Sequence, residues 1–343
     1  MILEIFLFVL AIYFISKIFN TKGNLPPGPV GIPYFGSFPY TTLKECIEAK
    51  AKYGNIFKVK AGAFNFVYIC DFKTAKECLS KVEFANRPEW KTMNIFKGER
   101  DQGKSCGIIF SNGSHWLHNR RFLLRHLRDL GMGKSKIEGL IMREVEDLVE
   151  DFKGLTKKPS KLPFSINITV LNIIWQLVAN EHLKTLNPSD PRDLMDDYLI
   201  EMKEKKSEDY SHFDFTDLTR ITFDLFLAGN DTTSNMTQWF LNYMARFQDV
   251  QEKIQKEIDR VVPRGTLPET QFISKTRNKF DPSRFLDKNG KFISTCDGFQ
   301  AFGIGKRQCL GEQFARMELY LITAALMQNF TFGPPKGRGT NEY

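Results

Sequence analysis

The sequence FGIGKRQCLG occupies residues 302–311, and the amphipathic stretch that follows it, residues 312–328, predicts a helix. Cys309 therefore lies at a helix amino terminus, where unpaired N–H groups and the positive end of the helix dipole stabilise a thiolate. Arg307 precedes it by two residues and can reach a carboxylate on a bound ring with paired hydrogen bonds. Close approach of a flat ring system to the backbone is permitted by three glycines, Gly303, Gly305 and Gly311. The stretch predicts a sulfur ligand for a metal; a free cysteine in a glycine-rich turn is the alternative.

A second unusual stretch, AGNDTT at residues 228–233, lies in the middle of a helical pattern that begins at Thr216. A glycine inside a helix costs about 1 kcal/mol relative to alanine, and adjacent β-branched threonines add to that cost. Such violations of local rules are expected at functional sites. We expect the Thr232 hydroxyl to donate to the carbonyl of Ala228, bending the helix and opening a notch beside Gly229 for a diatomic ligand. An ordinary core helix is the alternative for this motif alone.

A third motif, WLHNR at residues 116–120, places Trp116 and Arg120 at i and i+4, on one face of a predicted helix. It is a weak signal when taken alone. His115 and His118 have the spacing H-x-x-H, which suggests a metal, but no third ligand is apparent nearby. We therefore give the two histidines little weight as metal ligands.

The loop at residues 302–311 has the pattern F-x-x-G-x-R-x-C-x-G, which resembles the haem-binding loop of the cytochrome P-450 superfamily, the haem-thiolate monooxygenases. The resemblance implies that Cys309 is the axial ligand of haem b and the metal ligand of the site. It also implies that Arg307 pairs with a haem propionate and that Phe302 covers the sulfur. It extends the cofactor-binding role to two loop glycines, Gly305 and Gly311.

The other motifs resemble further segments of the same family. AGNDTT is similar to the A-G-x-D-T-T of its oxygen-activation helix, and Trp116 and Arg120 resemble the W-x-x-x-R pair whose side chains bind haem propionates. On the helix, the resemblance implies that Asp231 and Thr232 relay protons to oxygen. The full catalytic set that it implies is Ala228, Gly229, Asp231 and Thr232. Two shorter matches are PPGP at residues 26–29 and FDPSRF at residues 280–285.

The periodicity of the remaining sequence predicts a mainly α fold with a small β part, and the resemblance makes it the cytochrome P-450 fold. Short β-like runs at residues 56–59 and 66–69 alternate with helical runs at 43–53 and 72–79. After Trp116 helical signals dominate. We expect helices at residues 116–128, 135–153, 165–180, 191–206, 216–262 and 311–329.

The chain divides by composition into three expected parts. Residues 2–19 are apolar except for Glu4 and Lys17, which is about long enough to cross a bilayer, so residues 1–19 are predicted to form an uncleaved transmembrane anchor. A buried core helix is the alternative. Residues 20–34 are predicted to be a stiff proline-rich spacer, and residues 35–343 the haem-thiolate catalytic domain.

Composition and charge are those of an ordinary globular chain. Hydrophobic residues make up 42% and charged residues 26% of the 343 residues, which excludes collagen-like and disordered classes. The 31 phenylalanines suit a large apolar interior or one that holds a flat apolar ligand. The formal charge of +8 favours an acidic partner or an anionic membrane surface; we expect no nucleic acid, although charge alone does not exclude one. Six cysteines without a C-x-x-C pair indicate neither a disulfide framework nor a zinc ribbon.

Two segments that the family carries are missing from the sequence. Only residues 263–279 lie where the family has a helix bearing E-x-x-R and several strands. EIDR at residues 257–260 matches E-x-x-R, but it continues the preceding helical pattern, so we interpret the match as accidental. A second shortfall lies between His182 and Asn187, where the family has helices that roof the substrate pocket. We therefore expect an incomplete fold.

The resemblance implies an enzyme that inserts one atom of O₂ into a small apolar substrate, a lipid, steroid or xenobiotic. It implies electrons from an NADPH-dependent flavoprotein reductase and from cytochrome b5, contact with membrane lipid, and a place at the endoplasmic reticulum membrane with the catalytic domain on the cytosolic side. Basic residues between His115 and Lys136 predict a docking face for the reductase, or only a solvated helix face. The alternative function is a truncated, non-catalytic, membrane-anchored remnant with impaired haem binding, which the missing segments favour.

Overall fold

The computed structural model describes residues 6, 9, 10, 12, 13, 24–29, 31, 35–37, 43–62, 64–88, 106–129, 135–156, 160–178, 186–189, 191, 194–204, 214–261 and 299–334. The chain forms two compact units. The first comprises Met1–Ala85 with Ile304–Arg307, and the second comprises Asn86–Gly303 with Gln308–Tyr343. Each unit is built around its own apolar cluster.

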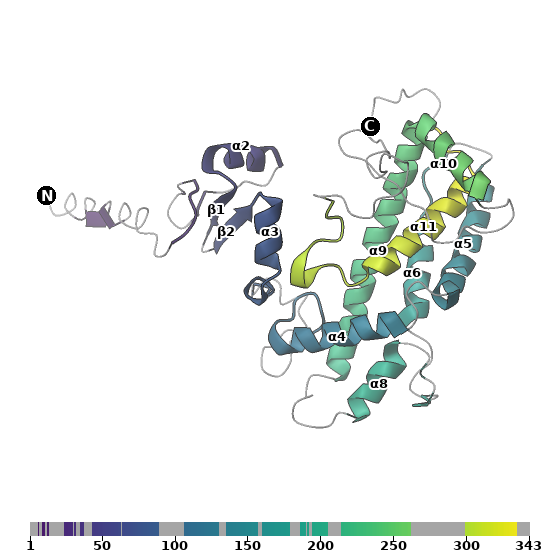
Figure 1. The fold of residues 1–343 in the computed structure, drawn as a ribbon, viewed down its shortest axis with the longest axis horizontal. Helices are drawn as coiled ribbons and strands as arrows, with labels where there is room; N and C mark the ends of the chain where they lie inside the picture. The colour runs from purple at the N-terminus through teal and green to yellow at the C-terminus, as the bar shows by residue number, and fades with distance from the viewer. Residues whose placement is uncertain are drawn as a thin grey trace. The chain divides into compact units, whose positions relative to one another are not determined.

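The first unit is a small α/β arrangement, labelled in Figure 1. It contains α2 (Leu43–Tyr53), β1 (Ile56–Ala61), β2 (Phe64–Ile69), α3 (Phe72–Leu79) and the short 3₁₀ turns η1 (Val82–Phe84) and η4 (Gly305–Arg307). The strands pair antiparallel, with Ile56 opposite Ile69. Phe57 stacks on Tyr68 at 5.0 Å between ring centroids and packs with Ala49 of α2. A cross-strand aromatic pair of this kind holds the two strands in register.

Local sequence explains why α3 begins where it does. The Asp71 carboxylate accepts a hydrogen bond from the Thr74 backbone N–H at 2.8 Å and from the Thr74 hydroxyl at 2.6 Å. This is a side-chain cap on the first helical turn. The two bonds lower the pKa of Asp71, because they favour its charged form.

The regular elements of the second unit are all helices within its described residues. Its helices are α4 (Gly113–Asp129), α5 (Ser135–Leu155), α6 (Ser165–Val178), α8 (Leu194–Glu204), α9 (Phe215–Arg246), α10 (Gln248–Val261) and α11 (Glu312–Asn329). In Figure 1, α9 is the long helix that α4 crosses near one end and α11 crosses near its middle. The mainly α fold with one small sheet confirms the predicted class.

The core of the second unit lies among α5, α6, α9 and α11. In this group α5 packs on α6, α6 on α9, α9 on α11, and α11 on α5. Apolar residues at helical spacing on α5 face this core, because they recur on one side of the helix: Ile141, Val145, Leu148 and Phe152 are all buried. α11 contributes Leu321, Ile322 and Leu326 to this core, and all three are buried.

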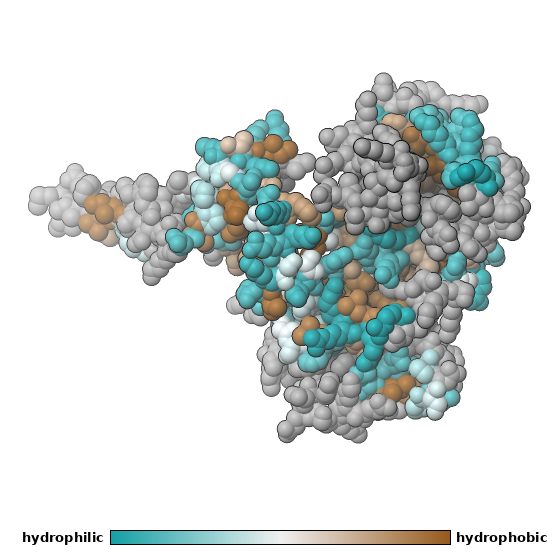
Figure 2. Space-filling view, in the orientation of Figure 1, coloured by the Kyte–Doolittle hydropathy of each residue, from teal (hydrophilic) through white to brown (hydrophobic). Residues whose placement is uncertain are grey.

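The prediction of one helix over residues 216–262 is wrong. Phe247 has φ −109° and ψ 74° and ends α9, donating its N–H to the carbonyl of Tyr243, and α10 begins at the next residue. The break turns α10 onto α11. Gln251 of α10 then exchanges two 2.8 Å hydrogen bonds with the backbone of Phe332. The apolar period continues across Phe247, so the sequence pattern hides the break. Figure 2 shows the outer side of α10 as hydrophilic.

The amino-terminal predictions fall largely on residues outside the described part. Of the predicted anchor, residues 1–19, the structure describes only 6, 9, 10, 12 and 13. No helix among the described residues combines the length and apolarity needed to cross a membrane. Within the predicted spacer, the Pro27 carbonyl accepts a hydrogen bond from the Lys58 N–H at 2.8 Å, so this part lies along β1. A Cβ on Gly28 would stand 2.0 Å from the carbonyl oxygen of Lys58, which requires glycine there.

Candidate functional site

Cys309 is exposed and lies three residues before α11. Its backbone N–H donates to the carbonyl of Phe302 at 2.8 Å, which closes the loop. Gly303 has φ 72°, a conformation that favours glycine. Gly311, at the N-cap position of α11, supplies no side-chain cap. The first N–H groups of α11 therefore add positive potential near the thiol, which is the environment that stabilises a thiolate.

Arg120 of α4 lies next to the same loop. Its guanidinium donates to the carbonyl of Gln308 at 2.7 Å and lies 5.9 Å from the ring centroid of Trp116, which is buried. Burial lowers the pKa of Arg120, and the negative charge available at Cys309 acts in the opposite direction. The W-x-x-x-R motif and the cysteine loop, far apart in sequence, thus meet through Arg120.

Phe302 is oriented by a charged neighbour. The guanidinium of Arg316 lies 4.8 Å from the Phe302 ring centroid and also pairs with Glu312 at 3.0 Å. A cation over an aromatic face is attracted by the ring quadrupole. The first two turns of α11 therefore hold the aromatic residue that begins the loop.

Gly305 and Arg307 belong to the first unit, in η4. Gly305 has φ 80°, and a Cβ there would stand 2.1 Å from the carbonyl oxygen of Leu79, so no other residue fits. Arg307 donates from Nε to the carbonyl of Ala85 at 2.7 Å. This bond orients the guanidinium and is a contact that sequence reasoning did not foresee.

The AGNDTT motif lies within the continuous helix α9. Thr232 Oγ1 donates to the Ala228 carbonyl at 2.7 Å, which confirms the predicted hydrogen bond. Asp231 and Thr232 are both exposed. A Cβ on Gly229 would stand 2.7 Å from Cδ1 of Ile174 on α6. The glycine therefore lies in close contact with α6, so a larger residue would force the Ile174 side chain to shift, a constraint that its position in the motif does not reveal.

A buried polar cluster joins α4 and the preceding segment to α9. Asp217, fully buried, accepts hydrogen bonds from His115 Nε2 at 3.0 Å, Asn119 Nδ2 at 2.7 Å and the Gly107 N–H at 2.6 Å. His115 of the H-x-x-H pair therefore has a carboxylate partner. Among the described residues no group of three His, Cys, Asp or Glu side chains is placed to hold a metal ion.

About two helical turns further on, a second buried aspartate holds the same segment. Asp224 accepts from the N–H groups of Ile108 and Ile109 at 2.8 and 3.1 Å and pairs with Arg220 at 3.0 Å. Burial raises the pKa of Asp224, while the two N–H donors act against that shift. The sequence signal that was missed is two aspartates seven residues apart on an otherwise apolar face of α9.

The model of the family "Cytochrome P450", written here as P-450, matches residues 26–185, 175–277 and 276–342 of the chain. Together these matches cover nearly the whole chain. The chain belongs to the cytochrome P-450 family. The predicted resemblance to this family is confirmed.

Curated relatives of this P-450 extend over most of its length. Cytochrome P-450 2L1 of Panulirus argus is 31% identical over 458 aligned positions, which cover 95% of this chain and 92% of the relative. Cytochrome P-450 2J2 of Homo sapiens is 29% identical, covering 96% of this chain and 89% of the relative. Cytochrome P-450 2C14 of Oryctolagus cuniculus is 27% identical, and the alignment covers 91% of this chain and 89% of the relative.

Internal segments are missing from this P-450, as predicted. The alignment with the Panulirus relative runs over 458 positions against 343 residues, so at least 115 positions have no counterpart here. The family matches change at residues 175–185 and 276–277, close to the two expected gaps. Arg284 of the FDPSRF segment lies outside the described residues. Glu257 and Arg260 pair with each other at 2.6 Å on the exposed side of α10.

The residues of this P-450 fit a haem-thiolate cofactor, which family membership implies. The one soft ligand of the loop, Cys309, is exposed before a helix amino terminus that has no side-chain cap. A half-buried guanidinium, Arg120, lies beside it and can neutralise a carboxylate. Gly305 has a positive φ and lies against the backbone of Leu79, so glycine is required there. No atom lies within 4 Å of the position that a Cβ would take on Gly303 or Gly311.

Proposed function

We propose that this P-450 is a monooxygenase that inserts one oxygen atom of O₂ into a small apolar substrate, a lipid, steroid or xenobiotic. The observation that carries the proposal is the exposed Cys309 thiol at the start of α11 with the Arg120 guanidinium bonded to the same loop. When bound, thiolate-ligated haem supplies electron density that favours O–O cleavage. The protein's part is to hold the cofactor, exclude water and move protons.

Each site residue has a distinct task under this proposal. Cys309 binds the metal. The guanidinium groups of Arg120 and Arg307 neutralise carboxylates of the cofactor, with Trp116 beside the first, because bidentate Arg–carboxylate pairs fix both charge and orientation. Phe302 shields the sulfur from water, and the cofactor is given room by two glycines, Gly305 and Gly311.

Proton movement is assigned to the Ala228–Thr232 turn of α9. The Thr232 hydroxyl donates to the Ala228 carbonyl, so its oxygen lone pairs stay available to accept a proton from outside the helix. Asp231 is exposed next to it and can exchange protons with solvent. Such a pair can act as a relay in which Asp231 takes up the proton and Thr232 delivers it.

The deciding experiment is a carbon monoxide difference spectrum of the reduced full-length protein. A band typical of thiolate ligation supports the monooxygenase. The rival is a non-catalytic membrane-anchored remnant that holds haem poorly, and the missing internal segments favour it. No band, or a band typical of a neutral ligand, would establish the remnant and overturn the proposal.

Removing the Thr232 hydroxyl tests the relay. Thr232→Ala is expected to lower product formation by about 10²-fold or more while NADPH is still consumed and peroxide is released. Thr219→Ala is the matched control, because Thr219 makes the same i−4 hydrogen bond on α9, at 2.8 Å, outside the motif. The ratio of product to NADPH consumed is measured for both; an unchanged ratio in Thr232→Ala refutes the relay.

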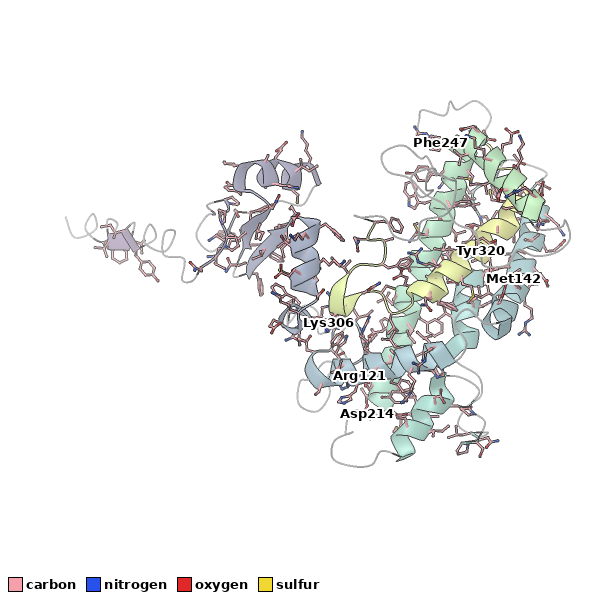
Figure 3. The ribbon with its side chains drawn as sticks, in the orientation of Figure 1. Arg121, Met142, Asp214, Phe247, Lys306 and Tyr320 are labelled. Atoms are coloured by element: carbon pink, nitrogen blue, oxygen red, sulfur yellow. The ribbon has the colours of Figure 1, made fainter. Side chains whose placement is uncertain are left out.

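Electrons are proposed to come from an NADPH-dependent flavoprotein reductase, with cytochrome b5 as a second donor, and to enter on the side of α4. The arginines of α4 have different surroundings. Arg125 pairs with Glu201 of α8 at 2.6 Å, so it serves to hold two helices together. Arg121 and Arg128 are exposed, and Figure 3 labels Arg121 on α4. These two are the charges that suit docking of an acidic partner.

Charge reversal on α4 tests this docking face. Arg121→Glu with Arg128→Glu is expected to slow reduction by the reductase and to flatten its salt dependence, since the field acts over a Debye length of about 8 Å at physiological ionic strength. Lys253→Glu with Lys256→Glu on the exposed side of α10 makes the same charge change elsewhere. The rate of reduction by the reductase is measured by stopped flow at low and high salt for the parent and for both double variants. Equal rates and salt slopes in the α4 variant and the parent would make the basic face a solvated surface only.

The same proposal places the chain at the endoplasmic reticulum membrane, with the catalytic part on the cytosolic side and residues 1–19 as the anchor. The support is the apolar run of residues 2–19. An apolar substrate dissolved in the lipid would then be concentrated next to the enzyme.

A further inference from the structure

Two rows of side chains lie next to each other on α4. The first row consists of His115 and Asn119, at i and i+4, and both are buried. The second row consists of Trp116 and Arg120, each one position later in the chain and so about 100° further around the helix axis. Whatever holds the first row therefore sets the direction in which the second row points.

The carboxylate of Asp217 on α9 binds both members of the first row. Asp217 is fully buried, and its N–H donates at 2.8 Å to the side chain of Asp214, labelled in Figure 3, which caps α9. Oδ1 of Asp217 accepts from His115 Nε2 at 3.0 Å, and Oδ2 accepts from Asn119 Nδ2 at 2.7 Å. Because the two donors are about one turn apart, the two bonds fix the rotation of α4 about its axis.

The same carboxylate holds the segment that leads into α4. The Gly107 N–H donates to Oδ1 of Asp217 at 2.6 Å. The Gly107 carbonyl accepts from Ser111 Oγ at 2.5 Å and from Asn119 Nδ2 at 3.3 Å. From α8, the Tyr198 hydroxyl lies 3.4 Å from Oδ2. The first turns of α4 therefore cannot rotate without breaking several buried hydrogen bonds at once.

Arg120 carries the position of α4 to the cysteine loop. Its Nη2 donates to the carbonyl of Gln308 at 2.7 Å, and Gln308 directly precedes Cys309. The guanidinium also lies 5.9 Å from the ring centroid of Trp116, which restricts its direction. A rotation of α4 by one residue, about 100°, would take this donor away from the loop. The bonds that Asp217 accepts oppose that rotation.

We propose that Asp217 is a positioning residue, whose bonds to His115 and Asn119 set the rotation of α4 so that Arg120 meets the loop of Cys309. That Arg120 then neutralises a carboxylate of the cofactor rests on the proposed function. The coupling from Asp217 to the loop does not, so it is measured without reference to catalysis. A residue that only stabilises the fold would leave the loop unchanged as long as the chain stays folded.

An exchange of side chains between positions 217 and 119 isolates the bond. Asp217→Asn alone sets two amides against each other, and Asn119→Asp alone sets two carboxylates against each other. In the double variant, the new amide at position 217 donates to the new carboxylate at position 119. Its oxygen still accepts from His115 and from the Gly107 N–H. The double variant also has the same net charge as the parent.

The first test measures hydrogen–deuterium exchange of the full-length chain by mass spectrometry. Each single variant is expected to speed backbone exchange by about tenfold, both in residues 113–120 and in the peptide that contains Cys309, because buried polar groups lose their partners. The double variant should restore most of the protection in both. Asp249→Ala, an exposed change on α10, should alter neither. Faster exchange in α4 with an unchanged Cys309 peptide, or a double variant no better than the single ones, overturns the proposal.

His115→Ala is the milder variant, for the case that the single exchanges yield too little folded protein. It removes one of the two bonds that fix the rotation and leaves the bond from Asn119 in place. Exchange is expected to rise by about threefold in the same two peptides. Exchange of the Cys309 peptide at the parent's rate contradicts the proposal.

The second test asks whether the effect reaches the loop through Arg120. Arg120→Ala should speed exchange of the Cys309 peptide, and adding Asn119→Asp should then speed exchange of α4 with no further change in that peptide. Additive effects on the Cys309 peptide would mean a route other than Arg120 and overturn the proposal. A parent without a thiolate band refutes the proposed function, while the exchange results still decide the role of Asp217.

Discussion

Replacing Cys309 by alanine or histidine is expected to abolish the thiolate-type band in the carbon monoxide difference spectrum completely. The reason is that Cys309 is the exposed thiol of the glycine-containing loop that precedes α11. Because Cys309 precedes α11, the change leaves the helix and its buried face intact. The far-ultraviolet circular dichroism of the variants should match that of the parent.

Cys78→Ala is the matched control for this prediction. Cys78 is a half-buried free thiol near the end of α3, in the first unit. Removing it takes away one thiol without touching the loop, so the band should stay. Persistence of a thiolate-type band in Cys309→Ala would show that another cysteine supplies the ligand and would end the assignment.

Asp217→Ala is expected to be the most destabilising single change on α9. The carboxylate is fully buried and receives hydrogen bonds from His115, Asn119 and the Gly107 N–H, so its removal strands three buried donors at once. Leaving a buried donor without its acceptor costs about 1–3 kcal/mol of the free energy of unfolding for each donor. Urea unfolding of the full-length chain measures the loss.

Two comparisons make the Asp217 result specific. Asp217→Asn retains one acceptor oxygen and should lose less stability than the alanine variant. Asp249→Ala removes an exposed carboxylate of α10 that lies 3.8 Å from Lys253, and it should change stability by less than about 1 kcal/mol. A loss in Asp217→Ala as small as that in Asp249→Ala would mean that the polar cluster contributes nothing net to the fold.

The local features of the site could be predicted from sequence because each depends on residues close together in the chain. The start of α11 after Cys309, the i−4 bond from Thr232 to Ala228, and the shared face of Trp116 and Arg120 all follow from helical spacing. The same holds for most element ends, such as those of α2 and α3. The resemblance to the family also indicated the missing internal segments, because only residues 263–279 lie where the family has a helix and several strands.

Features that depend on contact between distant segments could not be read from the chain. The pattern of residues 216–262 is helical throughout, and only packing of α10 on α11 explains the break at Phe247. The close approach of the Ile174 side chain on α6 to Gly229 also comes from another helix and could not be read from the motif. Arg125 was counted among the docking charges, but its partner Glu201 lies on α8.

The sequence by itself determined the family, the cysteine loop before α11 and the helix that carries the AGNDTT motif, because these depend on residue types at fixed local spacing. Only the tertiary structure decided which polar groups are buried together. Asp217 meets His115 across helices that are far apart in the chain. The physical reason is that burial and a partner, rather than residue type, set the charge state and the cost of a carboxyl group, and both arise only when the helices pack.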